Sequence, residues 1–382
     1  MKMKALSQIL LTSCLAVSSI TNSYACTVLI TRDVNGNIYE GRTNEFAGQQ
    51  PDSLTYFPVG TRIESVTPDG KQGKTFNTKY AILGAALKGM TANAKQDTLH
   101  EAVNDQGMTF TTNAFNDNSP PVVTSSPDKV LSLVDLGTWA LGNFQNVAQV
   151  KQALQSKEVD IWLPRIPSMG NLHAPVHFAL FDKTGAGIVI EFTNGQTVVY
   201  DNPVSVMTNS PPFPWHLQNL NNYAQLTNVD KNTGRFNGLK VNAPDSGNAL
   251  AGVPSIQISP GRFVKAAYYS NYSRKGKTPE EAIQTLSHVM NNFDRPFDIS
   301  VDEPGTAGQA EASASVKPSS EVTYFTVLND LSQGHFYLRT INAINFSKFD
   351  IRKLSALKEV KVVQFTSINA FTNADATELF FK

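Results

Sequence analysis

Short runs of apolar and β-branched residues, separated by turn signals, dominate the pattern of the chain after residue 25. Residues 26–31 form one such run, Asn35-Gly36 is a strong hairpin signal, and residues 38–42 return from the turn. Further runs over 176–181, 187–192, 197–200 and 205–208 predict a meander of strands. A last β region is predicted over 321–328 and 335–341.

Helical spacing of apolar residues occurs in three segments between these strands. Ser126-Pro127-Asp128 predicts the start of a helix that runs to Trp139, and Asn146 predicts the start of a second. Thr278-Pro279-Glu280-Glu281 is a capping-box start for a third. The apolar positions assigned to these helices are Val130, Leu131 and Val134; Val147, Val150 and Leu154; and Ile283, Leu286, Met290 and Phe293.

No internal repeat and no domain boundary interrupts this pattern. Residues 301–320 are rich in Ala, Ser, Gly and Pro, and they predict a mobile loop rather than a linker because strands resume after them. Hairpins separated by pairs of helices favour antiparallel sheets covered by helices. We therefore expect an α+β fold in which residues 26–382 form a single domain.

Composition excludes several classes of protein. The 382 residues carry 32 basic and 32 acidic side chains, so the net charge is zero and there is no electrostatic footprint for nucleic acid. The hydrophobic fraction of 41% suffices for a large core and excludes intrinsic disorder. The charged fraction of 17% is below the roughly 25% of an average soluble domain.

The first 25 residues have the pattern of a secretory signal. Lys2 and Lys4 precede an apolar stretch over 5–17, and Ser23-Tyr24-Ala25 predicts cleavage between Ala25 and Cys26. A membrane anchor is the first alternative, but the stretch is shorter than the roughly 20 apolar residues that span a bilayer. A lipoprotein signal is the second. We favour simple export, to the periplasm or the medium, with no membrane span after the signal is removed.

Cleavage between Ala25 and Cys26 makes Cys26 the first residue of the expected mature chain. The other cysteine, Cys14, leaves with the signal, so the mature chain has one thiol and no internal disulfide. An incidental buried thiol is one interpretation. The other is catalysis, because a free α-amine with a pKa of about 7.7–8.0 then lies beside a thiol of about 8.5 and can take its proton.

Other catalytic chemistries leave no comparable signal. The sequence contains no Gly-x-Ser-x-Gly, no His-Glu-x-x-His, no phosphate loop and no Cys-x-x-Cys. His173 and His177 are four residues apart near a predicted strand, and we interpret them as core or surface residues rather than metal ligands. The sequence predicts neither a metal nor an organic cofactor.

Several short motifs after Cys26 match a known family in order and spacing. They are Gly41-Arg42-Thr43-Asn44-Glu45, Asn104-Asp105-Gln106-Gly107-Met108, Val206-Met207-Thr208-Asn209-Ser210-Pro211 with Trp215-His216, Gly252-Val253-Pro254, and Ser259-Pro260-Gly261-Arg262-Phe263. The chain resembles the choloylglycine hydrolase family of N-terminal-nucleophile amidases, which contains bile salt hydrolases and penicillin V acylases. The resemblance implies a four-layer αββα sandwich of the N-terminal-nucleophile hydrolase type.

The resemblance also implies roles near the amino terminus. Cys26 corresponds to the nucleophile, and its freed amine to the general base. Arg42 corresponds to an arginine beside the thiol, where a guanidinium favours the thiolate; the alternative is an ordinary surface arginine. Glu45 stands where the family usually has Asp, with the expected role of orienting the amine.

The remaining implied roles lie further along the chain. Asn209 corresponds to a side-chain donor to the oxyanion, although Thr-Asn-Ser-Pro is also an ordinary turn sequence. Arg262 corresponds to a second arginine of the site. The other oxyanion donor is expected to be a backbone amide near Asn113-Ala114.

The reaction that the resemblance implies is hydrolysis of a linear, non-peptide amide of a small molecule. The exported members of the family lead us to expect a penicillin V acylase-like enzyme, with N-acyl homoserine lactones as possible substrates. Conjugated bile salt hydrolysis is the alternative, and a non-catalytic exported binding module is an alternative of another class.

Two further expectations concern apolar residues and assembly. Four aromatic residues lie beside the motifs, and we expect them either to line an acyl pocket or to belong to the core: Phe46, Phe115, Phe213 and Trp215. The resemblance implies a homo-oligomer, a tetramer, formed through the segment that spans 217–258.

Overall fold

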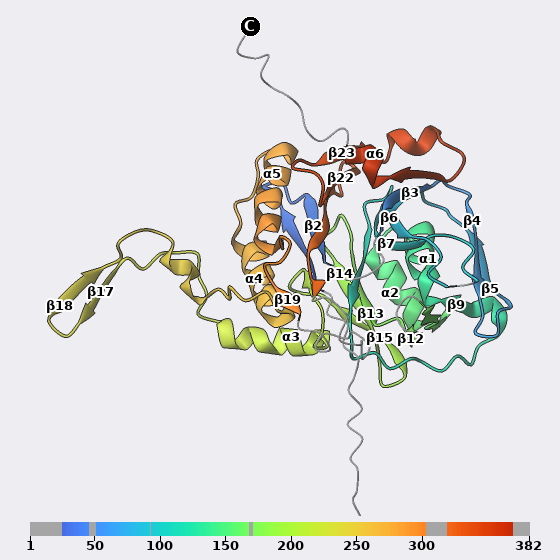
Figure 1. The fold of residues 1–382 in the computed structure, drawn as a ribbon, viewed down its shortest axis with the longest axis horizontal. Helices are drawn as coiled ribbons and strands as arrows, with labels where there is room; N and C mark the ends of the chain where they lie inside the picture. Colours follow the sequence, from blue (N-terminus) through green and yellow to red (C-terminus); the bar gives the residue numbers. More distant parts are fainter. Residues whose placement is uncertain (1–24, 46–50, 92, 168–170, 303–318, 370–382) are drawn as a thin grey trace, which may run out of the picture.

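Two β-sheets are stacked at the centre of the computed structural model, which describes residues 25–45, 51–91, 93–167, 171–302 and 319–369 (Figure 1). The first sheet has the strand order β16-β1-β2-β21-β22-β23 and the second has the order β15-β14-β13-β8-β7-β6-β3-β24. All strand pairs within these two sheets are antiparallel.

The strands of the first sheet are β1 (Cys26–Arg32), β2 (Ile38–Glu45), β16 (Val206–Met207), β21 (Thr323–Asp330), β22 (His335–Thr340) and β23 (Ser347–Asp350). Those of the second are β3 (Ser53–Phe57), β6 (Ile82–Leu87), β7 (Thr98–Asn104), β8 (Thr109–Ala114), β13 (Val176–Phe181), β14 (Gly187–Thr193), β15 (Gln196–Asp201) and β24 (Lys361–Gln364). The small two-stranded pairs are β4 (Arg62–Val66) with β5 (Gln72–Asn77), β9 (Val130–Ser132) with β10 (Asp160–Trp162), β11 (Arg165–Ile166) with β12 (Leu172–His173), β17 (Thr233–Phe236) with β18 (Leu239–Asn242), and β19 (Val301–Asp302) with β20 (Ser319–Ser320).

Helices cover the outer face of each sheet. The α-helices are α1 (Leu136–Asn143), α2 (Val147–Gln155), α3 (Phe213–Asn219), α4 (Ser259–Tyr272), α5 (Pro279–Met290) and α6 (Phe365–Asn369). Helices α4 and α5 pack on β1 and β2 of the first sheet, while α1 and α2 pack on the second sheet (Figure 1). The α+β class and the αββα layering predicted from the sequence are therefore confirmed.

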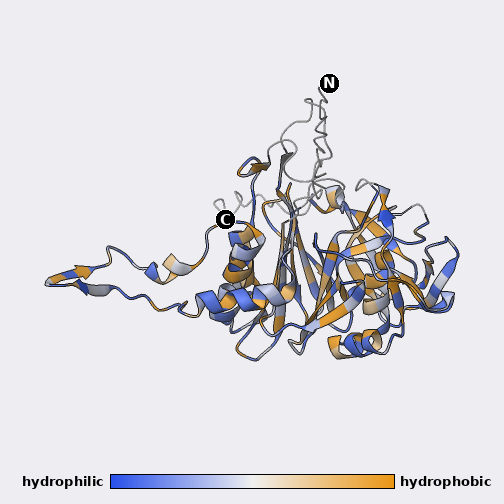
Figure 2. Ribbon diagram, turned by 90° about the horizontal axis from the view of Figure 1, so that it is seen from below, coloured by the Kyte–Doolittle hydropathy of each residue, from blue (hydrophilic) through white to orange (hydrophobic). Residues whose placement is uncertain are grey.

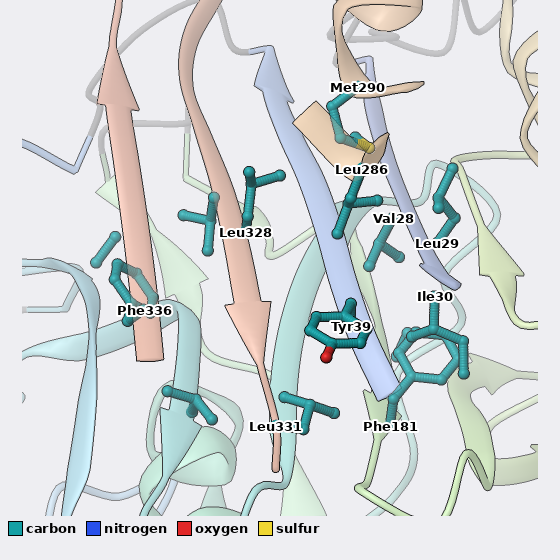
Figure 3. Packing of buried hydrophobic residues seen from close by; sticks show 14 of the residues in the cluster. Val28, Leu29, Ile30, Tyr39, Phe181, Leu286, Met290, Leu328, Leu331 and Phe336 are labelled. Carbon is teal, nitrogen blue, oxygen red and sulfur yellow. The ribbon is translucent and has the colours of Figure 1, made fainter. Parts of the chain in front are cut away.

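The core of the first sheet depends on a glycine in β2. A Cβ at Gly41 would lie 2.7 Å from the Cγ and Sδ atoms of Met290, so only glycine lets α5 approach this closely. Figure 3 shows Leu286 and Met290 of α5 beside β1 and β2, together with other apolar residues of this cluster. Because side chains alternate along a strand, Arg42 then lies on the opposite face of β2, toward the second sheet.

The strand predictions are confirmed, with one change of partner. The hairpin of β1 and β2 and the strands β13, β14, β15, β21 and β22 lie close to their predicted ranges. The last strand of the predicted meander, β16, leaves the second sheet and pairs with β1, placing Val206 opposite Leu29 and Met207 opposite Val28. This crossing brings the segment after Met207 to the start of β1.

Two helix predictions are confirmed and one is wrong. Asn146 caps α2 by accepting from the backbone amide of Gln149, and Thr278 caps α5 by accepting from Glu281. The predicted helix over 126–139 is instead a short 3-10 turn, then β9, then α1. Val130 and Leu131 pair in parallel with β10 and are buried, so strand pairing outweighs the helix-start signal of Ser126-Pro127. Helix α4 was not predicted.

A long arm projects from the body between α3 and α4. It carries the β17–β18 hairpin at its end, well away from the two sheets (Figures 1 and 2). Phe236 and Leu239 at the hairpin turn are 73% and 65% exposed. Apart from β19 and β20, the loop predicted over 301–320 lies outside the described residues, as does the signal up to residue 24. Within the described ranges, no helix is long and apolar enough to cross a membrane.

Candidate active site

Cys26 is the first residue of β1 and is buried, with 1% of its surface exposed. It pairs with Asn44 across the β1–β2 hairpin, and its sulfur lies 3.9 Å from Asn44 Oδ1 and 3.7 Å from the carbonyl oxygen of Glu45. The thiol therefore lies between the two sheets, on the same side of the first sheet as Arg42.

Arg42 contacts the thiol directly. Its Nη2 lies 3.5 Å from Cys26 Sγ and also donates to the carbonyl oxygen of Thr112 at 2.8 Å. The same nitrogen is 2.9 Å from His100 Nε2, and Nε forms an ion pair with Glu101 Oε2 at 3.6 Å. The side chain is fully buried, so the alternative of a surface arginine is wrong.

Two buried carboxylates share the surroundings of Arg42. Glu40 accepts from Thr109 at 2.7 Å and from Asn329 at 2.7 Å, and Glu101 accepts from Thr111 at 2.7 Å. Burial raises the pKa of Glu40 to about 7, and burial together with the Glu40 charge raises the pKa of Glu101 well above its usual value. Burial and mutual repulsion therefore disfavour ionisation of both carboxylates together, which preserves the positive field of Arg42 at the thiol.

Arg262 reaches the amino end of β1 from α4. It donates to the Cys26 carbonyl oxygen at 2.5 Å, to Thr27 Oγ1 at 2.8 Å and to Asn209 Oδ1 at 2.7 Å. Burial lowers the pKa of Arg262 to about 10, so it stays charged at neutral pH. It places a second positive charge beside Cys26, on the side opposite Arg42.

Asn209 follows β16 and contacts the nitrogen of Cys26. Its Oδ1 accepts from the Cys26 backbone nitrogen at 2.8 Å, while its Nδ2 donates to the carbonyl oxygen of Ala114 at 3.0 Å. Its own backbone amide donates to Ser259 Oγ at 3.0 Å. Asn209, which the resemblance identified, thus contacts Cys26 and does more than form a turn.

Glu45 is beside Cys26, but its carboxylate contacts another residue. Oε1 accepts from Thr323 Oγ1 at 2.8 Å, whereas the backbone amide of Glu45 donates to the Ala25 carbonyl oxygen at 3.1 Å. Burial raises the pKa of Glu45 to about 7, against the opposing effect of Arg262 and Arg295. With Ala25 in place, the carboxylate is near the charges of the site without bonding the Cys26 nitrogen.

Asn113 stabilises the segment that carries Asn209. Its Nδ2 donates to the carbonyl oxygen of Thr208 at 2.6 Å, and His177 Nε2 lies 3.0 Å from the same oxygen. The opposite ring nitrogen of His177 contacts Glu191 Oε1 at 3.1 Å. His173 lies on a separate strand and contacts the Leu163 carbonyl oxygen.

The described residues offer no cluster of three or more His, Cys, Asp or Glu side chains suited to a metal ion.

The protonation of the thiol reflects two opposing effects. Burial raises the pKa of Cys26, Arg42 and Arg262 lower it, and Glu45 raises it. Ala25 contributes to this burial, since it is itself 3% exposed and precedes Cys26 directly. A chain that began at Cys26 would lose the part of this desolvation that Ala25 supplies and would keep both arginines, which favours the thiolate.

Two cavities are lined in part by residues that contact Cys26 or Arg42. The amine-side cavity, about 360 Å³, is lined by Ala25, Asn209 and Arg262 among others. The apolar cavity, about 40 Å³, is lined by His100 and Thr112, both neighbours of Arg42, and by apolar residues that include Met90 and Phe178. The larger cavity therefore adjoins Ala25, which is bonded to the Cys26 nitrogen, and the smaller, apolar cavity adjoins two contacts of Arg42.

The aromatic residues suggested as pocket lining have other positions. Phe115 stacks on His177 and Phe213 belongs to the core cluster of the first sheet. Trp215 is 43% exposed, and Phe46 lies outside the described residues. Phe115 and Phe213 are therefore core residues, which was the second of the two interpretations of these aromatic residues.

The sequence did not reveal four residues of this region: His100, Glu101, Arg295, and Ser259 in its role as a hydrogen-bond acceptor. The one signal for the first two was a pair of polar residues inside the apolar run 99–103. Their partner Arg42 lies far away in sequence, so only the packing of the two sheets reveals the contact.

Known proteins resemble this chain over most of its length. Residues 26–363 match the family model of the linear amide C-N hydrolases, choloylglycine hydrolase family. A bile salt hydrolase/transferase from Clostridium perfringens is 26% identical over 357 residues, which cover 90% of this chain and 100% of that protein.

Two solved structures share the fold. A variant of the conjugated bile acid hydrolase from Clostridium perfringens superposes with a TM-score of 0.74 at 23% identity, covering 92% of this chain and 100% of the other. Penicillin V acylase from Agrobacterium tumefaciens superposes with a TM-score of 0.68 at 20% identity, covering 89% and 91%. The family match begins at Cys26 and spans most of the sequence, and the chain therefore belongs to the linear amide C-N hydrolases of the choloylglycine hydrolase family.

Proposed function

We propose that the mature chain begins at Cys26 and hydrolyses small N-acyl amides with this residue as nucleophile. The observation that carries the proposal is the placement of both reactive groups of one residue. Cys26 Sγ lies 3.5 Å from Arg42 Nη2, and Cys26 N lies 2.8 Å from Asn209 Oδ1. Release of residue 25 would turn that nitrogen into an amine fixed beside its own thiol.

The reaction then proceeds in two halves. The α-amine takes the thiol proton, and the thiolate attacks the amide carbonyl carbon to form a tetrahedral oxyanion. The ammonium returns the proton to the leaving nitrogen, the C–N bond breaks, and a thioester and a free amine remain. Water gives a proton to the α-amine and its oxygen to the acyl carbon, which releases the carboxylic acid and regenerates the thiol.

The two arginines and Asn209 have separate tasks in this scheme. Arg42 and Arg262 stabilise negative charge on and beside Cys26. Asn209 is the side-chain donor to the oxyanion once its Nδ2 exchanges the Ala114 carbonyl oxygen for the substrate oxygen. No metal or organic cofactor takes part in this mechanism.

The choice among substrates follows from the resemblance and from the expected export. The signal predicted over residues 1–25 groups this chain with the exported members of the family. We therefore place the enzyme with penicillin V acylase-like amidases, with N-acyl homoserine lactones as further substrates. Bile salt hydrolysis is the second candidate, supported by the name of the relative from Clostridium perfringens.

Export belongs to the same proposal. Cleavage of a signal between Ala25 and Cys26 would free the catalytic amine as the protein leaves the cytoplasm. This supports a periplasmic or secreted location.

The purified mature enzyme should begin at Cys26 and release amine from at least one of three substrates assayed in parallel: penicillin V, a long-chain N-acyl homoserine lactone and glycocholate. Cys26→Ser should retain the fold and lose nearly all turnover, because a hydroxyl is a much weaker nucleophile than a thiol at this pH. N-terminal mass analysis and amine release measure both outcomes.

Active enzyme that retains Ala25 would refute the amine as base, and wild-type rates in Cys26→Ser would refute the nucleophile. Absence of turnover on all three amides, together with a thiol that iodoacetamide does not alkylate at neutral pH, would favour the non-catalytic binding module.

Asn209→Ala should lower kcat by about 10²–10³-fold with little change in KM, because the lost donor acts on a charge that develops only in the transition state. Steady-state kinetics on the best amide measures the split. A rise in KM with kcat unchanged would show that Asn209 binds the substrate in its ground state instead of stabilising the transition state.

We further propose that the arm joins copies of this chain into a tetramer. Phe236 and Leu239 expose large apolar side chains at its end, and Val229, Leu250, Ile256 and Ile258 are also exposed along the segment. An apolar surface of this kind, projecting from the body, is typical of an interface between subunits (Figure 2).

Light scattering should give a tetramer for the wild type and a smaller species for the double variant Phe236→Glu, Leu239→Glu, because charged side chains at the hairpin turn resist burial. Ile344→Glu is the matched control, since Ile344 is 78% exposed but lies outside the arm. A monomeric wild type, or an equal effect of the control, would contradict the proposal.

A further inference from the structure

A buried histidine that the mechanism does not use contacts the backbone of Asn209. His216 belongs to α3 and is 1% exposed, and its Nε2 lies 2.8 Å from the carbonyl oxygen of Asn209. It is the second residue of the Trp215-His216 motif, to which the scheme above assigns no task. His216 is not among the described residues that line the amine-side cavity or the apolar cavity, so any effect on the reaction passes through its neighbours.

The imidazole of His216 is the donor in this contact. Burial lowers the pKa of His216 to about 4, so the ring is neutral at neutral pH and carries one N–H. A carbonyl oxygen only accepts, and the distance of 2.8 Å is that of an N–H···O hydrogen bond. The N–H is therefore assigned to Nε2, which donates to Asn209.

Aromatic packing fixes the plane of the ring. His216 stacks on Phe263 of α4, with ring centroids 4.5 Å apart and an angle of 14° between the planes. Phe263 directly follows Arg262, which donates to Asn209 Oδ1 at 2.7 Å. One turn of α4 therefore orients both the imidazole and the guanidinium that contact Asn209.

Ser259 bonds the other polar group of the Asn209 backbone. The backbone amide of Asn209 donates to Ser259 Oγ at 3.0 Å, and the same oxygen lies 2.9 Å from Thr208 Oγ1. The amide and the carbonyl of Asn209 are thus bonded to two different helices, α4 and α3. These two contacts fix the position of the Asn209 backbone.

The proposed reaction requires the side chain of Asn209 to change partner while its backbone stays in place. Nδ2 donates to the Ala114 carbonyl oxygen at 3.0 Å and exchanges it for the substrate oxyanion. Oδ1 meanwhile accepts from the Cys26 nitrogen at 2.8 Å. An oxyanion donor contributes most when its position is fixed before the charge develops. The bonds to His216 and Ser259 provide this fixed position, because neither involves the side-chain amide that moves.

We propose that His216 is a positioning residue that orients the side-chain amide of Asn209 toward the oxyanion by holding the Asn209 carbonyl oxygen. This inference rests on the proposed amidase function. The hydrogen bond, and not the aromatic ring, is then the feature of His216 on which the reaction rate depends. A side chain that keeps the donor should keep the rate, and one that keeps only the ring should lose it.

Two substitutions at this position separate the hydrogen bond from the ring. His216→Phe keeps the stack on Phe263 and removes the donor, whereas His216→Gln removes the ring and keeps an N–H donor. His216→Phe should lower kcat by roughly 10–100-fold with little change in KM, because a misplaced donor weakens only the transition state. His216→Gln should retain most of the wild-type kcat. Steady-state kinetics on the best amide found above measures both variants.

Three results of this comparison would overturn the proposal: a wild-type kcat in His216→Phe, an equal loss of kcat in both variants, or a rise in KM alone. Thermal melting shows whether His216→Phe is folded. If it is not, His216→Met is assayed in its place with the same expected and contradicting results, because Met also lacks a donor and its flexible side chain adapts to the space of the ring.

A double-variant cycle tests whether the effect passes through Asn209. In the Asn209→Ala background, His216→Phe should cause no further fall in kcat, because the donor that it positions is already absent. A further fall as large as that in the wild-type background would contradict the proposal.

His173→Phe is the matched control. It also removes an imidazole that contacts a backbone carbonyl oxygen, that of Leu163, but His173 lies on β12 and does not contact Asn209. The control should leave kcat close to that of the wild type. A loss of kcat equal to that of His216→Phe would show that the effect is not specific to the Asn209 contact.

Failure of the proposed function gives a different result. If the wild type hydrolyses none of the three amides, the amidase function is wrong, and the positioning is then measured at Cys26, whose nitrogen donates to Asn209 Oδ1. His216→Phe should change the pH profile of Cys26 alkylation by iodoacetamide in the same direction as Asn209→Ala, and His216→Gln should not. Identical profiles in the wild type and His216→Phe, or a change that Asn209→Ala does not share, would refute the positioning role.

Discussion

The contact of two buried guanidinium groups with the first residue of a strand is the interaction on which this site depends. Arg42 reaches Cys26 Sγ from β2 and Arg262 reaches the Cys26 carbonyl oxygen from α4. A buried charge is tolerated only where neighbours compensate it. The second sheet supplies Thr112, His100 and Glu101 as partners of Arg42. The position of Arg42 at the thiol therefore depends on the stacking of the two sheets.

Two features of the backbone make this arrangement possible. Gly41 lets α5 pack against β2, and the alternation of side chains then directs Arg42 toward the second sheet. The crossing of β16 to the first sheet delivers Asn209 to the Cys26 nitrogen, where Asn113 and His177 hold the preceding carbonyl of Thr208. Strand pairing thus brings together the thiol of Cys26, its backbone nitrogen and the side chain of Asn209.

Much of the fold was predictable because its signals are local. Asn35-Gly36 marks the hairpin that presents Cys26, and Thr278-Pro279 marks the start of α5. The segment over 130–132 was mistaken for helix because its partner strand β10 lies about thirty residues later. Arg42, Asn209 and Arg262 followed from the resemblance, whereas His100, Glu101 and the Arg295–Glu321 pair act through contacts between distant segments that no sequence period records.

The central claim is that release of the residue before Cys26 converts a buried, inert thiol into the nucleophile. The most direct measurement is the pH dependence of the alkylation rate of Cys26 by iodoacetamide in two forms, one beginning at Cys26 and one retaining Ala25. With Ala25 present, burial raises the pKa of the thiol more than Arg42 and Arg262 lower it. The account predicts faster alkylation with a lower apparent pKa in the form that begins at Cys26; identical profiles in the two forms would contradict it.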